Sequence, residues 1–198
     1  MDVVKKTIEA YEEKAEEYAK LIPGIETIKE TADFFIKNLK GKKILDVGCG
    51  PGRDTKYFTE QGFDVTAIDL TKALLTIAKK QAPKAQFHLM DMRKLEFPDN
   101  SFDGLWVNAS LLHLPKKEAK PTLLGFKRIL KPGGVIFIAV REGFEEKFSL
   151  EKGLKRFYAN YTKEELSNLV KETGFILIKE DRKESGHMWI RMFATKPE

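Results

Sequence analysis

Residues 44–52 constrain this chain more than any other stretch, because an apolar run there ends in three glycines at alternate positions. An apolar run closed by turn residues predicts a buried strand that enters a tight loop. Gly48, Gly50 and Gly52 carry no Cβ, so the backbone can approach a ligand closely. Residues 53–58 can begin a helix whose free N–H groups face the loop. The stretch therefore predicts a place that holds a nucleotide-like ligand.

Strand and helix patterns alternate between residues 43 and 140. The expected strands cover 43–47, 64–68, 86–90, 102–107 and 135–140, and the expected helices cover 53–61, 72–81 and 116–130. This alternation indicates a parallel sheet with helices on both faces. Thr71 is the expected N-cap of the helix 72–81.

The two ends of the chain follow other patterns. Apolar residues at helical spacing predict amphipathic helices over 2–20 and 25–39, which precede the first strand and are expected to form a cap. Near the other end, Thr162 and Glu165 form a capping box before a helix over 163–172. Two strands, 175–181 and 188–195, then predict an antiparallel hairpin added to the parallel sheet.

The composition excludes several classes of protein. The single cysteine, Cys49, allows neither an internal disulfide nor a multi-cysteine zinc site, and we expect it to fill space in the loop without a bound metal. The longest apolar run is far shorter than a membrane span, and the charged N-terminus has no signal-peptide core, so we expect a cytoplasmic protein. The net charge of +5 reflects a Lys/Glu-rich surface without a long basic run, so nucleic acid is not an expected partner.

Polar residues follow the expected parallel strands, at Asp46, Asp69, Asp91 and Asn108. In an open parallel sheet, ligands bind outside the carboxyl ends of the strands, so these side chains should line one crevice. Asp69 lies nineteen residues after Gly50, close to the spacing of an acid that binds ribose hydroxyls.

The glycine spacing narrows the choice of ligand. The pattern is G-x-G-x-G rather than the G-x-G-x-x-G of dinucleotide enzymes, and Asp46 and Asp54 flank the loop. These acids disfavour a pyrophosphate and favour a cation. A ligand that combines a ribose with a positive charge is S-adenosylmethionine.

Residues 46–52, Asp-Val-Gly-Cys-Gly-Pro-Gly, resemble the first motif of the class I S-adenosylmethionine-dependent methyltransferases. Asp69, the pair Asp91-Met92 and residues 130–134 (Leu-Lys-Pro-Gly-Gly) agree with later motifs. The resemblance covers about residues 40–196. It implies an α/β, Rossmann-like, doubly wound fold whose seven-stranded, mostly parallel sheet has the order 3-2-1-4-5-7-6. It also implies one domain over 1–198, with a helical cap (1–40), a cofactor-binding core (41–141) and a part (142–198) that holds a variable segment, the last helix and the hairpin.

The resemblance assigns cofactor-binding roles position by position. The three glycines would shape the loop around the methionine part, with Asp46 near its ammonium and the backbone carbonyl of Asn108 close by. On the adenosine side, Asp69 with its neighbour Leu70 would bind the ribose. Asp91 would accept from the adenine amino group, and Met92 would pack on the ring.

Other candidates have a functional and a structural interpretation. Arg53 would reach the cofactor carboxylate or simply start a solvated helix. Tyr11 and Tyr18 would close over the cofactor or pack the cap. His113 is the candidate general base, or it only hydrogen-bonds its loop.

Four further positions have side chains of interest. Arg141 and Tyr158 are candidates for the lining of a substrate pocket. His187 and Trp189 are expected to be structural.

The expected acceptor is a small molecule. The position after the fourth strand lacks the Asn/Asp-Pro-Pro-aromatic motif typical of base amino methylation, and the only cysteine lies in the cofactor loop. The expected product is S-adenosylhomocysteine, and the protein should be a monomer or a homodimer. The alternatives are a non-catalytic S-adenosylmethionine-binding protein, a methyltransferase acting on RNA or protein, and a nicotinamide-dependent oxidoreductase.

Overall fold

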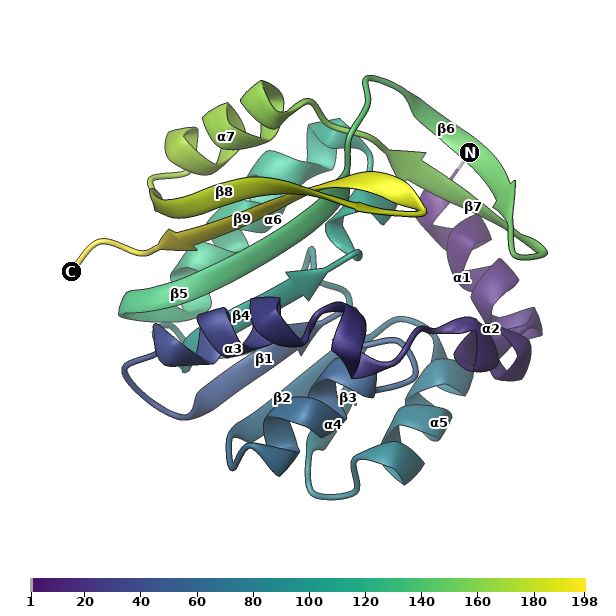
Figure 1. The fold of residues 1–198 in the computed structure, drawn as a ribbon, viewed down its shortest axis with the longest axis horizontal. Coiled ribbons are helices and arrows are strands. Elements are labelled where there is room, and N and C mark those ends of the chain that lie inside the picture. Colours follow the sequence, from purple (N-terminus) through teal and green to yellow (C-terminus); the bar gives the residue numbers. More distant parts are fainter. Residues whose placement is uncertain (1) are drawn as a thin grey trace.

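A seven-stranded sheet forms the centre of the molecule in a computed structural model that describes residues 2–198 (Figure 1). Its strands are β3 (Gln86–Leu89), β2 (Asp64–Asp69), β1 (Lys43–Val47), β4 (Phe102–Asn108), β5 (Leu130–Arg141), β9 (His187–Thr195) and β8 (Ile176–Ser185), in that spatial order. The first five run parallel, whereas β9 is antiparallel to both of its neighbours. Because β6 and β7 lie outside this sheet, β8 and β9 are its sixth and seventh strands along the chain. The predicted order 3-2-1-4-5-7-6 and the terminal hairpin are therefore confirmed.

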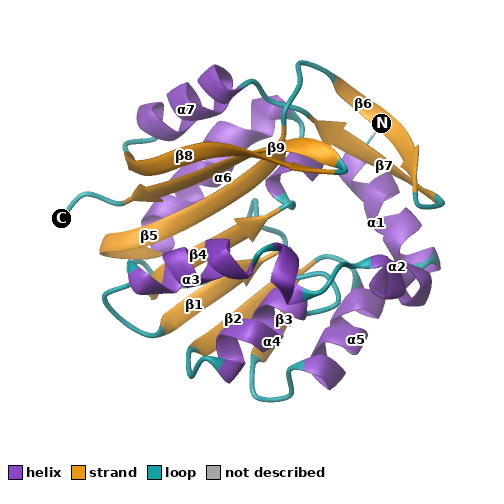
Figure 2. Ribbon diagram, in the orientation of Figure 1, coloured by secondary structure: helices purple, strands orange, loops and turns teal. Residues whose placement is uncertain are grey.

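Helices cover both faces of this sheet (Figure 2). One face carries α3 (Lys29–Lys37), α4 (Arg53–Glu60) and α5 (Lys72–Gln81), and the other carries α6 (Lys116–Ile129) and α7 (Lys163–Glu172). The predicted capping box of α7 is present, because Thr162 Oγ1 accepts from the Glu165 amide and the Glu165 carboxylate accepts from the Thr162 amide.

The N-terminal segment differs from the expected pair of cap helices. The helix expected over 2–20 breaks at Lys14, where φ is −126° and ψ is 29°, into α1 (Val3–Glu13) and α2 (Ala15–Leu21). The second consists of a short 3-10 turn, η1 (Ile25–Thr27), and α3. Phe35 of α3 is fully buried against Phe58 and Trp106, so α3 belongs to the layer that covers the sheet. Among the described helices that precede β1, α1 and α2 lie beyond the ends of the sheet strands (Figure 1).

A second hairpin lies in the variable segment between β5 and α7 and faces α1. It consists of β6 (Glu146–Glu151) and β7 (Leu154–Ala159), joined by Lys152 and Gly153, both with positive φ. Two such residues make the tight turn that suits a hairpin, but asparagine or aspartate at the first position is the usual sequence signal. Thr7 Oγ1 of α1 accepts from the Phe157 amide at 3.0 Å, which attaches the helix to this hairpin.

Candidate functional site

The loop after β1 adopts the conformation that its glycines predict. Gly48 and Gly50 have φ values of 72° and 55°, in the left-handed region where other residues are strained. A Cβ on Gly48 would lie 2.4 Å from the Cβ of Ser110, so this glycine allows two chain segments to meet. A Cβ on Gly50 would meet nothing within 4 Å, because this glycine faces the cavity described below.

Asp69 joins the end of β2 to the glycine loop. Its Oδ2 accepts from the Gly50 amide at 2.9 Å, and its Oδ1 accepts from the Thr71 amide at 2.8 Å. Burial raises the pKa of Asp69, although both backbone N–H groups oppose this effect. Each carboxylate oxygen keeps acceptor capacity for a further donor. The side chain can therefore accept from two ligand hydroxyls without releasing the loop.

Two acids meet beneath the same loop. Asp46 is buried, accepts from Thr55 Oγ1 at 2.6 Å, and has a pKa of about 8, raised by burial and by the negative charge of Asp54. Asp54 accepts from Trp106 Nε1 at 2.8 Å and from the side-chain amide of Asn108 at 2.9 Å. Because Asp46 is held protonated beside Asp54, a cation bound there would be stabilised by ionisation of Asp46, and the position therefore suits a cationic ligand.

The predicted adenine acceptor has a partner that sequence reasoning missed. Arg93 forms a fork on Asp91, with Nε at 3.0 Å from both oxygens and Nη2 at 2.6 Å from Oδ2. Burial raises the pKa of Asp91, but the hydrogen bonds from Arg93 outweigh it, so the pKa lies below its usual range. Leu70 and Met92 line the same cavity.

Side chains of α1 and α2 and of the first residue of α4 also line the site. Arg53 Nε donates to Asp54 at 2.6 Å, and its Nη1 donates to the Pro23 carbonyl at 3.3 Å. The ring of Tyr18 lies edge-on to that of Tyr11, with centroids 4.8 Å apart. Both tyrosines and Arg53 line the cavity.

Thr71 stands at the N-cap of α5, but its side chain does not cap the helix. Instead, the Glu12 carboxylate of α1 accepts from the amides of Lys72 and Ala73 at 2.5 and 3.1 Å. Thr71 is thus the N-cap residue as predicted, but the side chain that accepts from these N–H groups is Glu12, which is distant in sequence. The contact also holds α1 over the core.

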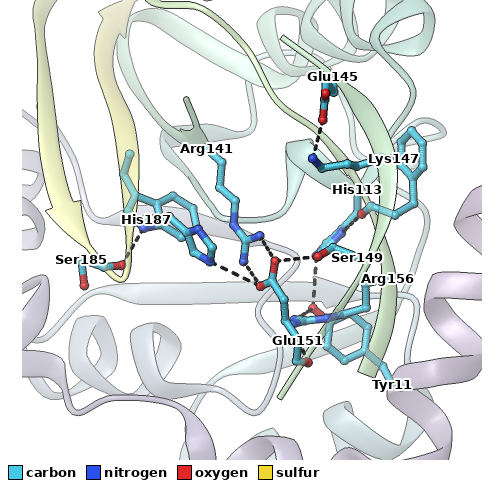
Figure 3. A network of polar contacts seen from close by, with 12 residues as sticks. Tyr11, His113, Arg141, Glu145, Lys147, Ser149, Glu151, Arg156, Ser185 and His187 are labelled. Atoms are coloured by element: carbon cyan, nitrogen blue, oxygen red, sulfur yellow. Dashed lines mark hydrogen bonds and ion pairs between the residues drawn. The ribbon is translucent and has the colours of Figure 1, made fainter. Parts of the chain in front are cut away.

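His113, in the short 3-10 turn η2 (Leu111–His113), lies in a directed chain of hydrogen bonds (Figure 3). Its Nδ1 lies 2.7 Å from the Phe157 carbonyl, which can only accept, so Nδ1 carries the proton. Nε2 is then the acceptor for the Tyr11 hydroxyl at 3.1 Å, and that hydroxyl accepts from Arg156 Nη1 at 2.8 Å. Burial and the nearby positive charges of Arg156 and Arg141 lower the pKa of His113 to about 3. The ring is therefore neutral at pH 7, with its Nε2 lone pair directed at Tyr11.

A second polar group joins β5, the β6–β7 hairpin and β9 (Figure 3). Arg141 Nη1 and Nη2 donate to the two oxygens of Glu151, each at 2.6 Å, which lowers the pKa of Glu151 to about 2. The Arg141 guanidinium lies 3.9 Å from the ring centroid of Tyr158. His187, expected to be structural, lines the cavity, with Nε2 at 3.5 Å from Glu151 Oε2.

These groups surround one cavity of about 540 Å³. The glycine loop and the ends of β1, β2 and β4 form one side, and α1, α2, the β6–β7 hairpin and the β8–β9 turn form the other. The structure therefore brings all the sequence-predicted site residues except Gly52 to this cavity, together with Asp54, Glu151 and Arg156. Sequence reasoning missed Arg156 as a site residue because its strand was not recognised. Within residues 2–198, no helix is long and apolar enough to cross a membrane.

Comparisons with known proteins agree with this geometry. Residues 45–138 match the sequence model of a methyltransferase domain. Phosphoethanolamine N-methyltransferase 1 of Arabidopsis thaliana is 34% identical over 171 residues, which cover 80% of this chain and 34% of that protein. Demethylmenaquinone methyltransferase of Renibacterium salmoninarum is 33% identical over 99 residues, covering 50% and 41% of the two chains. This chain thus spans less than half the length of these curated relatives.

A solved structure matches more of the chain. It is the 1,6-didemethyltoxoflavin-N1-methyltransferase of Burkholderia thailandensis, with bound 1,6-didemethyltoxoflavin and S-adenosylhomocysteine. The two share 26% identity and a TM-score of 0.72, over 86% of this chain and 78% of the other.

Proposed function

We propose that this chain, whose domain belongs to the class I S-adenosylmethionine-dependent methyltransferases, transfers a methyl group from S-adenosylmethionine to a small-molecule acceptor. The observation that carries the proposal is the position of Asp69 and the Asp46–Asp54 pair on two sides of one glycine loop. Together they offer hydroxyl acceptors and a buried carboxyl that a nearby cation would ionise, which suit a ribose and a cationic methionine part.

The residues at the loop fit this cofactor. Asp69 has acceptor capacity left on both oxygens for the two ribose hydroxyls. Asp46, with its pKa of about 8, becomes a carboxylate readily when a positive charge approaches. Gly50 leaves the backbone open to the cavity, and Leu70 and Met92 supply apolar surface for an adenine ring.

The cavity also supports a small acceptor. Its volume of about 540 Å³ lies within the range of small-ligand sites and must hold both the cofactor and the acceptor. The relatives named above are methyltransferases of phosphoethanolamine and of demethylmenaquinone, and the Burkholderia structure contains bound 1,6-didemethyltoxoflavin. We therefore favour a small molecule over RNA or protein, with α1, α2 and the β6–β7 hairpin covering it.

Bound S-adenosylmethionine supplies an electrophilic methyl group, and the protein's main contribution to an in-line displacement is positioning. We assign a proton-accepting role to the pair of His113 and Tyr11. The acceptor's proton would pass to the Tyr11 oxygen, and the Tyr11 proton to Nε2 of His113, as the acceptor atom takes the methyl group and S-adenosylhomocysteine is left.

Two experiments test the function. Calorimetric titration should show binding of S-adenosylmethionine and none of NAD, and the reverse result would point to a nicotinamide-dependent oxidoreductase. Labelled methyl transfer is then measured against a metabolite collection, bulk RNA and a protein extract. Transfer only to a metabolite supports the proposal, transfer to RNA or protein contradicts the small-molecule acceptor, and binding without transfer to any of them indicates a non-catalytic protein.

The proton-accepting role has its own test once an acceptor is found. His113→Gln and Tyr11→Phe should lower kcat while leaving the affinity for S-adenosylmethionine unchanged. An unchanged kcat in both variants would refute the role assigned to this pair.

A further inference from the structure

The charges around the cavity are divided between its two sides. The lining residues between 46 and 108 include four acids and one base: Asp46, Asp54, Asp69, Asp91 and Arg53. Those between 141 and 191 include one acid and five bases: Glu151, Arg141, Lys152, Arg156, Lys183 and Arg191. The acidic side is the one assigned above to the cationic cofactor. The basic side lies beyond it, at the β6–β7 hairpin and the β8–β9 turn.

Arg156 is the buried cation on this side without a carboxylate partner. Its exposed fraction is 5%, and its described hydrogen bonds go to the Tyr11 hydroxyl, at 2.8 Å from Nη1, and to the Glu151 backbone carbonyl, at 3.4 Å from Nη2. The rings of Tyr11, Tyr18 and Tyr158 also lie near the guanidinium, with centroids 5.3, 5.5 and 5.3 Å from its carbon, but they carry no negative charge. The hydrogen bonds use two of the five N–H donors of the guanidinium, and Nε has no partner among residues 2–198. Because an uncompensated charge is costly to bury, native proteins pair buried arginines with an anion.

The neighbours of Arg156 do not supply that anion. Arg141 takes both oxygens of Glu151, so this carboxylate is already in a two-pronged ion pair. The ring of Tyr158 packs near both guanidiniums. Its centroid lies 3.9 Å from the guanidinium carbon of Arg141 and 5.3 Å from the guanidinium carbon of Arg156. The Tyr158 hydroxyl is buried and has no hydrogen-bond partner among the described residues, and burial raises its pKa to about 12. A neutral O–H donor therefore stands beside an unpaired cation.

We infer that the acceptor carries an acid group, a phosphate or a carboxylate, that binds to Arg156 with Tyr158 as a second donor. This inference rests on the proposed function and names the class of its substrate. A guanidinium fork matches both oxyanions, and the apolar surroundings strengthen the pairing.

The inference also orients the acceptor. Tyr11 contacts both Arg156 and His113, so the proton-accepting pair lies next to the proposed anion site. An acceptor anchored at Arg156 would thus have its acid group at the β6–β7 hairpin and its methyl-accepting atom directed past Tyr11 toward the glycine loop.

The test uses the protein loaded with S-adenosylhomocysteine and two simple anions, inorganic phosphate and acetate, at constant ionic strength against chloride. Thermal unfolding is followed as each anion is titrated, first for the unchanged protein. An anion that binds the folded state raises the melting temperature in a saturable way. We expect saturable stabilisation by at least one of the two, and the more effective anion identifies the acid group.

Three variants locate the effect. Arg156→Gln should weaken anion binding at least tenfold, and Arg156→Lys should weaken it less because it keeps the charge but loses the fork. Lys155→Gln is the matched control, since Lys155 is the exposed neighbour on the same strand, and it should respond like the unchanged protein. If Arg156→Gln fails to fold, the lysine variant carries the comparison.

The outcomes separate this inference from the proposed function. Failure of the unchanged protein to bind S-adenosylhomocysteine in calorimetry would refute the proposed function itself. Binding of S-adenosylhomocysteine without any saturable response to either anion would refute only the anion site. An equal response in the Arg156 variants and the Lys155 control would also refute it.

Discussion

Replacing Asp69 with alanine should weaken S-adenosylmethionine binding far more than it weakens the fold. The substitution removes two hydrogen bonds from ribose hydroxyls to a carboxylate, each contributing about 1.5–3 kcal/mol. The sum, about 3–6 kcal/mol, corresponds to a loss of roughly 10²- to 10⁴-fold in affinity. The amides of Gly50 and Thr71 also lose their acceptor, but both border a cavity that water can enter, so the free energy of unfolding should fall by only about 1–3 kcal/mol.

Calorimetric titration with S-adenosylhomocysteine measures the affinity, and urea unfolding measures the stability. Asp69→Asn is an informative second variant, because one of its two polar atoms becomes a donor that faces a backbone N–H group. It should therefore also bind weakly, despite its size. Asp64→Ala is the control, since Asp64 lies exposed at the start of the same strand. A folded Asp69→Ala variant with unchanged affinity would refute the ribose assignment.

Three further predictions address the charge, the cap and the core. Burial and Asp54 raise the pKa of Asp46, so a bound cation should lower this pKa and S-adenosylmethionine should release protons on binding near neutral pH. Binding should therefore tighten as the pH rises toward the raised pKa. Calorimetry in buffers of different ionisation enthalpy should detect the proton release, and Asp46→Asn should abolish it. Glu12→Ala removes the side chain that caps α5 and should lower the free energy of unfolding by about 1 kcal/mol. Glu13→Ala, on the same helix as Glu12, is the control and should have no effect. Equal losses of stability in the two variants would contradict the capping role of Glu12. Phe35→Ala should cost about 3–5 kcal/mol in urea unfolding because α3 packs on the sheet, and a loss below about 1 kcal/mol would contradict this placement of α3.

The amino-acid sequence by itself determined the sheet and the cofactor side of the site. The glycine loop and its flanking acids are local patterns, since Gly48, Gly50 and Asp46 lie within five positions of one another. The strand order followed from the resemblance to a known family, and Asp69 followed from a fixed distance along one β-α-β unit. Such features are readable because each depends on nearby residues or on a connection of constant length.

Only the tertiary structure brought together the residues of the proposed acceptor side. Tyr11, His113 and Arg156 are separated by up to 145 positions, yet they form one chain of hydrogen bonds. No local spacing encodes such a contact, because it depends on how α1 packs against the β6–β7 hairpin. The same reason explains why Glu12 rather than Thr71 caps α5. The charges that line the cavity come from two distant segments of the chain, one mostly acidic and one mostly basic, and they face one another only because the fold places both segments around one cavity.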